Sequence, residues 1–353
     1  MLAFRMRVLA LIVIGVFFWS GKVLPDKKDD VPVKAKLRPD SAIFFSEPGL
    51  CGSVVGLVNP HTNKNEDYIF DQALYNFRVD TLPQVIFWRQ IMNLHQDSSI
   101  LCVASNRSFI QKVSNKEWDK QSDEQKKAFR DSLKCVLGLD TNERILLTAG
   151  KKFFYDFNKT YLNFHRGINC FVENEVDPWY AQAILLIESP NKLQKSNAGA
   201  YGPFQLMKEV ARLFGLKVNK HIDERADFDR SAYAASSLIK KVCIPNARRI
   251  LDSLGINNYR EDELWFRMLV MHCYHAGSGN VQSALFTFRP QEGNMDLIYN
   301  LWRAQTRRFK SASQNYSQLV LAAMLEMNDR VSALDKLAGT LSINSSSSSG
   351  KLN

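Results

Sequence analysis

A single carboxylate stands at the end of a strongly apolar stretch of the chain. Residues 180–187 contain one polar residue in eight, which predicts a helix buried on all sides, and Glu188 follows them directly. Burial of a carboxyl group disfavours its charged form and therefore raises its pKa. A carboxyl group that keeps its proton near neutral pH can serve as a general acid. The alternative for this helix is a glutamate that reaches solvent or pairs with a lysine.

A glycine-containing turn follows this helix, and polar side chains flank it. Gly199 and Gly202 predict a turn at which the backbone comes close to another group. Ser196 and Gln205 place polar groups beside that turn. Residues 274–281, which read Tyr-His-Ala-Gly-Ser-Gly-Asn-Val, end another helix that begins near residue 262.

These segments together resemble the lytic transglycosylases of the soluble type (SLT), which are relatives of goose-type lysozyme and cleave peptidoglycan. The pattern is Glu-Ser, then Ser-x-x-Gly-Ala-x-Gly-x-x-Gln-Leu-Met, then Tyr-x-Ala-Gly-x-Gly-x-Val. A fourth element, residues 314–323, is similar to a late family segment built around a tyrosine. The resemblance covers about residues 176–325 and implies a mainly α, lysozyme-like helical catalytic domain.

The resemblance implies roles for seven residues. Glu188 matches the catalytic acid/base, and Tyr316 matches a tyrosine whose hydroxyl contacts that glutamate. The positions expected to bind substrate are Ser196, Gln205, Met207, Tyr274 and His275. The resemblance implies no metal and no cofactor.

The chain departs from the family pattern at several points. His275 stands where the family usually has asparagine, and a histidine can still donate or accept a hydrogen bond there. Residues 203–204 read Pro-Phe instead of Leu-Met, and Tyr201 is bulkier than the usual residue. One residue fewer separates the catalytic glutamate from Ser196, which affects the expected placement of that serine.

The spacing of acidic residues bears on the mechanism. Ordinary glycoside hydrolysis uses two carboxyl groups, but no acidic residue occurs between Glu188 and Glu209. One carboxyl group is enough if the substrate supplies its own nucleophile. In the lytic reaction, the C6 hydroxyl of the muramic acid attacks its own anomeric carbon and closes a 1,6-anhydro ring. We therefore expect a lyase that cleaves the bond between N-acetylmuramic acid and N-acetylglucosamine.

Two other functions remain open at this point. The first is a catalytically silent, glycan-binding scaffold of an envelope machine, which we would expect to have lost its acid. The second is a lysozyme-type muramidase, which would need a second acid to position water. The sequence does not distinguish endo from exo cleavage.

Several further helices are expected to position these residues. Asp177 and Pro178 suit the start of the helix that ends at Glu188. Other helices are expected at about residues 208–214, 229–242, 262–275, 294–309 and 316–338. An acidic cluster with two arginines, at residues 223–230, is interpreted as a solvated helix start.

The rest of the chain is divided by composition. Residues 1–21 contain two arginines and a twelve-residue apolar run, which predict a signal peptide or a membrane anchor. Residues 22–42 are expected to be a linker, and residues 43–175 a smaller mixed region of unknown role. The catalytic domain is expected at residues 176–340 and a disordered, serine-rich tail at 341–353.

The region at residues 43–175 offers two local patterns. Residues 122–125 have the spacing of a helix capping box. An aromatic cluster at residues 153–157 is interpreted as core.

The predicted signal or anchor indicates the compartment and the partners of the protein. The protein is expected on the periplasmic side of a bacterial cell envelope, with peptidoglycan glycan strands as partner and the inner membrane as a second partner if the first segment is retained. The net charge of +10 favours anionic partners, but no nucleic-acid motif is present. Six cysteines permit up to three disulfides or a mixture of disulfides and free thiols. His272 and His275 have a spacing compatible with a metal, but no third ligand motif accompanies them, so a core histidine is favoured at position 272.

Overall fold

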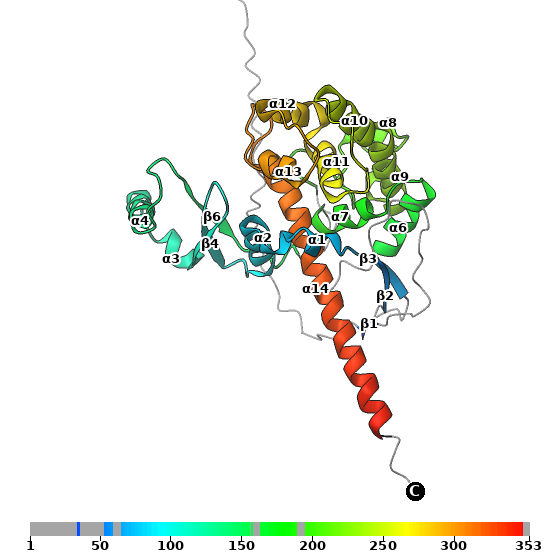
Figure 1. The fold of residues 1–353 in the computed structure, drawn as a ribbon, viewed down its shortest axis with the longest axis horizontal. Helices are drawn as coiled ribbons and strands as arrows, with labels where there is room; N and C mark the ends of the chain where they lie inside the picture. The colour runs from blue at the N-terminus through cyan, green and yellow to red at the C-terminus, as the bar shows by residue number, and fades with distance from the viewer. Residues whose placement is uncertain are drawn as a thin grey trace, which may run out of the picture.

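The computed structural model describes residues 34–35, 53–58, 65–155, 157, 163–188 and 195–348, with side chains between residues 67 and 333 of these ranges. The fold is mainly helical and has two small antiparallel sheets (Figure 1). The expected signal or anchor and most of the linker lie outside the described residues. Among the helices that the structure does describe, none combines the length and the apolar character that crossing a membrane requires.

The helical body carries the segment that resembles the transglycosylases. Its helices are α6 (Phe164–Glu173), α7 (Trp179–Glu188), α8 (Lys208–Leu213), α9 (Phe228–Leu238), the π-helical turn η4 (Ile239–Cys243), α10 (Ile244–Ser253), α11 (Leu264–Ala276), α12 (Ser278–Phe288), α13 (Met295–Leu301) and α14 (Ser311–Ser348). A short 3-10 turn, η3 (Glu224–Ala226), precedes α9. The helices expected at residues 208–214, 229–242 and 262–275 are confirmed within a few residues.

Helix α7 lies at the centre of this body. Its start is as predicted, because the Asp177 carboxylate accepts a hydrogen bond from the Trp179 N–H at 3.0 Å. Every residue from Trp179 to Ile187 is buried. Gly167 allows α6 to approach closely, since a Cβ at that position would come within 2.8 Å of Leu185 Cδ1. The apolar stretch is therefore a fully enclosed helix that delivers Glu188 at its end.

Two predictions about the last helices are wrong. The helix expected over residues 294–309 ends at Leu301, because the chain turns between Thr306 and Phe309 and buries the Phe309 ring. The tail expected to be disordered over residues 341–353 is helical as far as Ser348, as an extension of α14. Adding a residue to an existing helix needs no new nucleation, and serine lowers helix stability only modestly. Residues 349–353 lie outside the described part.

The N-terminal elements divide into two groups. Strands β1 (Lys34–Ala35), β2 (Ser53–Val58) and β3 (Asn65–Phe70) form one sheet, followed by α1 (Ala73–Asn76), η1 (Val79–Thr81) and α2 (Pro83–Asn93). Strands β4 (Ser98–Val103), β5 (Phe109–Ser114) and β6 (Ile145–Ala149) form a second sheet in the order β5-β4-β6. Helices α3 (Asn115–Asp119) and α4 (Asp123–Val136) connect β5 to β6, and the predicted capping box at Ser122 and Gln125 is confirmed. Figure 1 shows this second group projecting from the helical body beside α2.

The main hydrophobic core crosses the domain boundary expected at residue 176. It includes side chains of β3, α2 and α6 together with those of α7, α11 and α14. Tyr68 donates a hydrogen bond to Asn328 Oδ1 at 2.6 Å, and Trp88 Nε1 donates to Gln318 Oε1 at 3.0 Å. A sequence pattern shows which faces are apolar but not which distant partner covers them. Among the residues with described side chains, the β5-β4-β6 sheet has a second, small core of its own, around Leu101, Trp118 and Ile145.

The cysteines that the structure describes are all free thiols. They are Cys102, Cys135, Cys170, Cys243 and Cys273. Cys51 lies outside the described residues, so of the pairings allowed by the count none is formed among the other five.

Candidate active site

Glu188 occupies the C-terminal end of α7, directly after the enclosed part of that helix. Its side chain is half-buried. Burial raises the pKa of Glu188 to about 7, and a hydrogen bond from Tyr316 opposes part of that rise. No neighbouring carboxylate contributes to the shift among the residues that the structure describes. The group can therefore hold its proton near neutral pH and also release it there, which general acid and base steps both require.

Tyr316 comes from the first part of α14, far from Glu188 in the chain. Its hydroxyl donates a hydrogen bond to Glu188 Oε1 at 2.9 Å. The phenol ring is buried. Burial and the nearby charge of Glu188 raise the pKa of Tyr316, so the hydroxyl keeps its proton. A tyrosine hydroxyl can donate to the carboxylate and accept from the protonated acid, so the same contact suits both states.

Two residues at the end of α11 complete this group. The His275 ring stacks on the Tyr316 ring, with centroids 4.1 Å apart and planes 19° apart. The Tyr274 hydroxyl donates to the Phe204 carbonyl at 2.6 Å, and burial and the charge of Glu188 raise the pKa of Tyr274. The structure thus brings Glu188, Tyr316, Tyr274 and His275 together.

The other three predicted site residues lie on the turn at residues 196–207. Ser196 Oγ accepts a hydrogen bond from the Ala200 N–H at 2.9 Å, and the Ser196 N–H donates to the Ala200 carbonyl. Gln205 Nε2 donates to the Gly202 carbonyl at 3.0 Å, and the Gln205 backbone has a left-handed φ of 46°. Met207 is exposed at the start of α8. Ser196 and Gln205 therefore shape the turn itself, and Tyr274 ties the turn to α11.

Gly202 shows why this turn needs a glycine. Its φ is +89°, and a Cβ there would lie 1.8 Å from the Arg225 carbonyl oxygen. No side chain fits this position without moving the backbone of η3. The turn is therefore fixed against η3 by close backbone contact.

Arg225 is a residue whose importance the sequence did not reveal. Its guanidinium is buried and donates to the carbonyls of Gly199 and Leu206 at 2.8 and 2.9 Å. Asp223 pairs with the same guanidinium at 2.7 Å. The acidic cluster interpreted as a solvated helix start is solvated only in part. Asp227 does cap α9 by accepting from the Arg230 N–H, but Arg225 points inward and clamps the turn.

Tyr155 is a second residue whose position was not predicted. The aromatic cluster at residues 153–157 was expected to be core, and Tyr155 and Phe157 are indeed buried with stacked rings, whereas Phe153 is exposed. Burial and the negative charge of Glu188 both raise the pKa of Tyr155. The mixed N-terminal region thus contributes a buried side chain whose pKa responds to the charge of the candidate acid. Neither the spacing nor the resemblance carried a signal for it.

The other chemical possibilities do not assemble into sites in the described structure. His272 is a buried histidine within 2.8 Å of Ser317 Oγ, and burial lowers the pKa of His272 to about 3. Among the described residues, no three histidine, cysteine or acidic side chains lie where they could share a metal ion.

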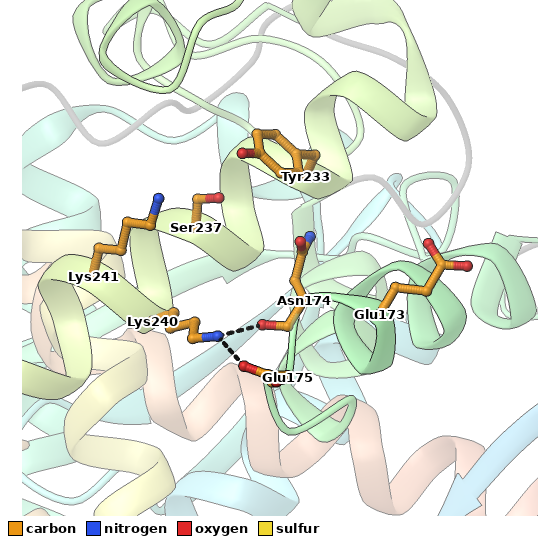
Figure 2. A pocket seen from close by; sticks show the side chains of 7 residues that line it. All are labelled: Glu173, Asn174, Glu175, Tyr233, Ser237, Lys240 and Lys241. Carbon is orange, nitrogen blue, oxygen red and sulfur yellow. Dashed lines mark hydrogen bonds and ion pairs between the residues drawn. The ribbon is translucent and has the colours of Figure 1, made fainter.

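A cavity of about 200 Å³ lies between α6, α9 and η4 and contains none of the predicted site residues. Figure 2 shows the Lys240 ammonium at its edge, between the Asn174 carbonyl and the Glu175 carboxylate. The Lys240 cation is already neutralised by Glu175, and we assign this cavity no part in the chemistry at Glu188.

Comparison with known families supports the resemblance. Residues 171–294 match the family model described as the transglycosylase SLT domain. This part of the chain is similar to SLT domains. SLT domains belong to lytic transglycosylases, lyases that act on peptidoglycan glycan strands in the cell envelope. A search of curated proteins found no significant match.

The residues that match the family model include three parts of the candidate site. The SLT domain match includes α7 with Glu188, the turn at residues 196–207 and α11 with Tyr274 and His275. Tyr316 and Tyr155 lie outside the match, on α14 and in the N-terminal region. The site around Glu188 thus combines SLT residues with side chains from both flanking parts of the chain.

Proposed function

We propose that this chain is a peptidoglycan lytic transglycosylase in which Glu188 is the only catalytic carboxyl group. The observation that carries this proposal is the pairing of a half-buried Glu188 with the Tyr316 hydroxyl, without a second carboxylate near it in the described structure. An enzyme that hydrolyses glycosides usually places two carboxyl groups about 5–9.5 Å apart. A single carboxyl group suits a reaction in which the substrate supplies the nucleophile.

In the proposed reaction, Glu188 first gives its proton to the glycosidic oxygen that leaves the muramic acid. The resulting carboxylate then takes the proton from the C6 hydroxyl of the same sugar. That oxygen attacks the anomeric carbon and closes the 1,6-anhydro ring, so the proton count balances and no water is consumed. The attack is intramolecular and therefore has a large effective-concentration advantage. Before the first proton transfer and after the second, Glu188 is protonated and Tyr316 accepts a hydrogen bond from it. Between the two transfers Glu188 is a carboxylate, and Tyr316 donates to it.

Two other functions would make different demands on this site. A lysozyme-type muramidase would use the same acid but would need a group to position water. A silent scaffold would have no use for a carboxyl group with a pKa of about 7. Retention of Glu188 and its tyrosine partner favours a working enzyme over a scaffold. The net charge of +10 suits attraction to the anionic wall.

The test is digestion of purified sacculi followed by mass spectrometry of the released fragments. Wild-type protein should release fragments that end in 1,6-anhydro muramic acid, which resists borohydride reduction. Glu188→Gln should lower the rate by at least about 10²–10⁴-fold, because a positioned general acid is lost. Glu209→Gln, which removes an exposed carboxylate on α8, is the matched control and should digest at the wild-type rate. Fragments with reducible ends would instead identify a muramidase.

We further propose that the protein works on the periplasmic side of the envelope and that its first 21 residues direct it there. The apolar run behind two arginines supports this part of the proposal. Fractionation of cells that express the full chain, followed by mass spectrometry of the N-terminal peptide, tests both compartment and cleavage. Recovery of the intact chain in the cytoplasm would contradict it.

A further inference from the structure

Two cations converge on one indole ring where the β5-β4-β6 sheet meets the helical body. Arg107 Cζ lies 5.7 Å from the centre of the Trp88 ring, and Lys151 Nζ lies 6.0 Å from it. The Arg107 guanidinium also lies 5.6 Å from the Phe87 ring. Arg107 and Trp88 are buried, whereas Lys151 is half-buried and so remains open to solvent on one side.

The backbone holds both cations in place. Arg107 lies in the turn between β4 and β5 with a left-handed φ of 63°, a conformation that is costly for a residue with a side chain. Its N–H donates to the Val103 carbonyl at 2.9 Å. Lys151 follows β6, and its N–H donates to the Ile91 carbonyl of α2 at 2.8 Å. The two side chains thus come from different connections of the sheet and meet over α2.

Neither cation has an acidic partner in the described part of the chain. Three arginines are buried there, and Arg225 and Arg267 pair with Asp223 and Asp177 at 2.7 Å each. Arg107 differs, because its guanidinium donates to neutral acceptors only.

Those acceptors are Asn315 Oδ1 at 3.1 Å and Cys102 Sγ at 3.9 Å. Burial lowers the pKa of Lys151, and no carboxylate of the described residues opposes that effect. A buried charge without a counter-charge is costly, so this pair is suited to an anion delivered from outside.

The cation pair is joined to the candidate active site from two directions. Asn315, which accepts from Arg107, immediately precedes Tyr316 on α14. The Lys151 carbonyl accepts from the Tyr155 N–H at 3.0 Å, and Tyr155 lies near enough to Glu188 to sense its charge. The cation pair and the candidate acid therefore share two connecting segments, one on α14 and one at residues 151–155.

We propose that Arg107, Lys151 and Trp88 form a subsite for a carboxylate of the peptide stem that the muramic acid of peptidoglycan carries. This inference rests on the proposed function, which supplies the substrate. The stem begins on the sugar at the scissile bond and carries free carboxylates further along. A guanidinium and an ammonium over an indole form charge-assisted hydrogen bonds with such a group, and these are stronger than neutral ones. In this proposal, the mixed N-terminal region binds the peptide stem while the helical body binds the glycan strand.

The test uses a monosaccharide ligand that has no glycosidic bond to cleave. Binding of N-acetylmuramoyl peptide, and of the same compound with every carboxyl group amidated, is measured by calorimetry on the full chain. Wild-type protein should bind the acid form at least about fivefold more tightly than the amide form. Lys151→Gln should remove most of that difference, and Lys151→Glu should remove it entirely. Lys152→Gln, the same charge change at the exposed neighbouring residue, should preserve it.

Equal binding of the acid and amide forms to the wild-type protein would overturn the subsite, as would a Lys151→Gln variant that still distinguishes them. Circular dichroism of each variant shows whether a lost preference comes from lost fold. The results distinguish a failure of the subsite from a failure of the proposed function. If the wild-type protein releases anhydro ends but binds the acid and amide forms equally, only the subsite is refuted. A charge-dependent preference without anhydro ends refutes only the reaction.

Discussion

The imidazole of His275 lies flat against the phenol ring of Tyr316, with ring centroids 4.1 Å apart. The hydroxyl of that phenol donates to Glu188 at 2.9 Å, so the histidine is connected to the carboxyl group through the tyrosine. His275 was expected to contact substrate in place of the family's asparagine. That contact stays a prediction, whereas the stacking fixes the plane of the ring whose hydroxyl donates to Glu188.

The stacking predicts different outcomes for two substitutions of His275. His275→Ala removes the ring and should lower kcat/KM by about 2–10-fold, the range expected for an aromatic pair worth about 0.5–1.5 kcal/mol. His275→Phe keeps a stacked ring without ring nitrogens and should retain most of the wild-type activity. Sacculus digestion rates of the two purified variants provide the comparison. If the phenylalanine variant is as slow as the alanine variant, the imidazole nitrogens act on substrate directly.

The hydrogen bond from Tyr316 predicts a shift in the pH dependence of the reaction. The first step needs protonated Glu188, so activity should fall as pH rises above about 7, the pKa of that group. The Tyr316 hydroxyl lowers the pKa of Glu188, so Tyr316→Phe should move this alkaline limb to higher pH while also reducing the maximal rate. Profiles of kcat/KM against pH for both proteins would show the shift. A reduced rate with an unmoved limb would mean that the hydroxyl does not act on Glu188.

Glu188→Gln should stabilise the fold at neutral and higher pH although it removes the proposed catalytic acid. The pKa of Glu188 is raised from 4.5 to about 7, so the folded state binds the proton more tightly than the unfolded chain. The stability contributed by this group is therefore fully present below pH 4.5 and lost as pH rises through 7. The glutamine variant should exceed the wild type by about 1–3 kcal/mol in free energy of unfolding at pH 8. Denaturant unfolding should show this gain disappearing at pH 4.

The contact between Gly202 and η3 predicts a large loss of stability on a small substitution. Gly202→Ala places a Cβ 1.8 Å from the Arg225 carbonyl oxygen and should cost about 2–4 kcal/mol in free energy of unfolding. Gly199→Ala is the matched control, because its φ of +92° is similar but a Cβ there meets nothing within 4 Å. It should cost only about 1–2 kcal/mol, from the left-handed backbone. Equal thermal unfolding temperatures for the two variants would show that the turn can move away from η3.

Sequence alone predicted the centre of the site better than its surroundings. The apolar run of α7 made the burial of Glu188 predictable, because a helix without a polar face must be enclosed. The contact with Tyr316 came only from the resemblance, since 128 positions separate the two residues and no local pattern links them.

Arg225 and Tyr155 illustrate why the surroundings were not predictable. A charged residue among aspartates has the same sequence signature whether it is solvated or turned inward, and Arg225 is turned inward. An aromatic residue in a cluster indicates burial, as it does for Tyr155, but not which group it is buried beside. The positions of both side chains depend on tertiary contacts, which leave no periodic pattern in the sequence.

The hydrogen bond between Tyr68 and Asn328 has a consequence for the emerging polypeptide. The β3 strand and α14 belong to one core, so that core stays incomplete until about 260 further residues have been synthesised. Contacts this distant along a chain make folding slow, because a long loop must close before they form. Tyr316 reaches Glu188 at the same late stage. A nascent chain that has already produced the whole SLT match therefore still lacks the tyrosine that donates to Glu188, and the proposed chemistry has to wait for residues that follow the match.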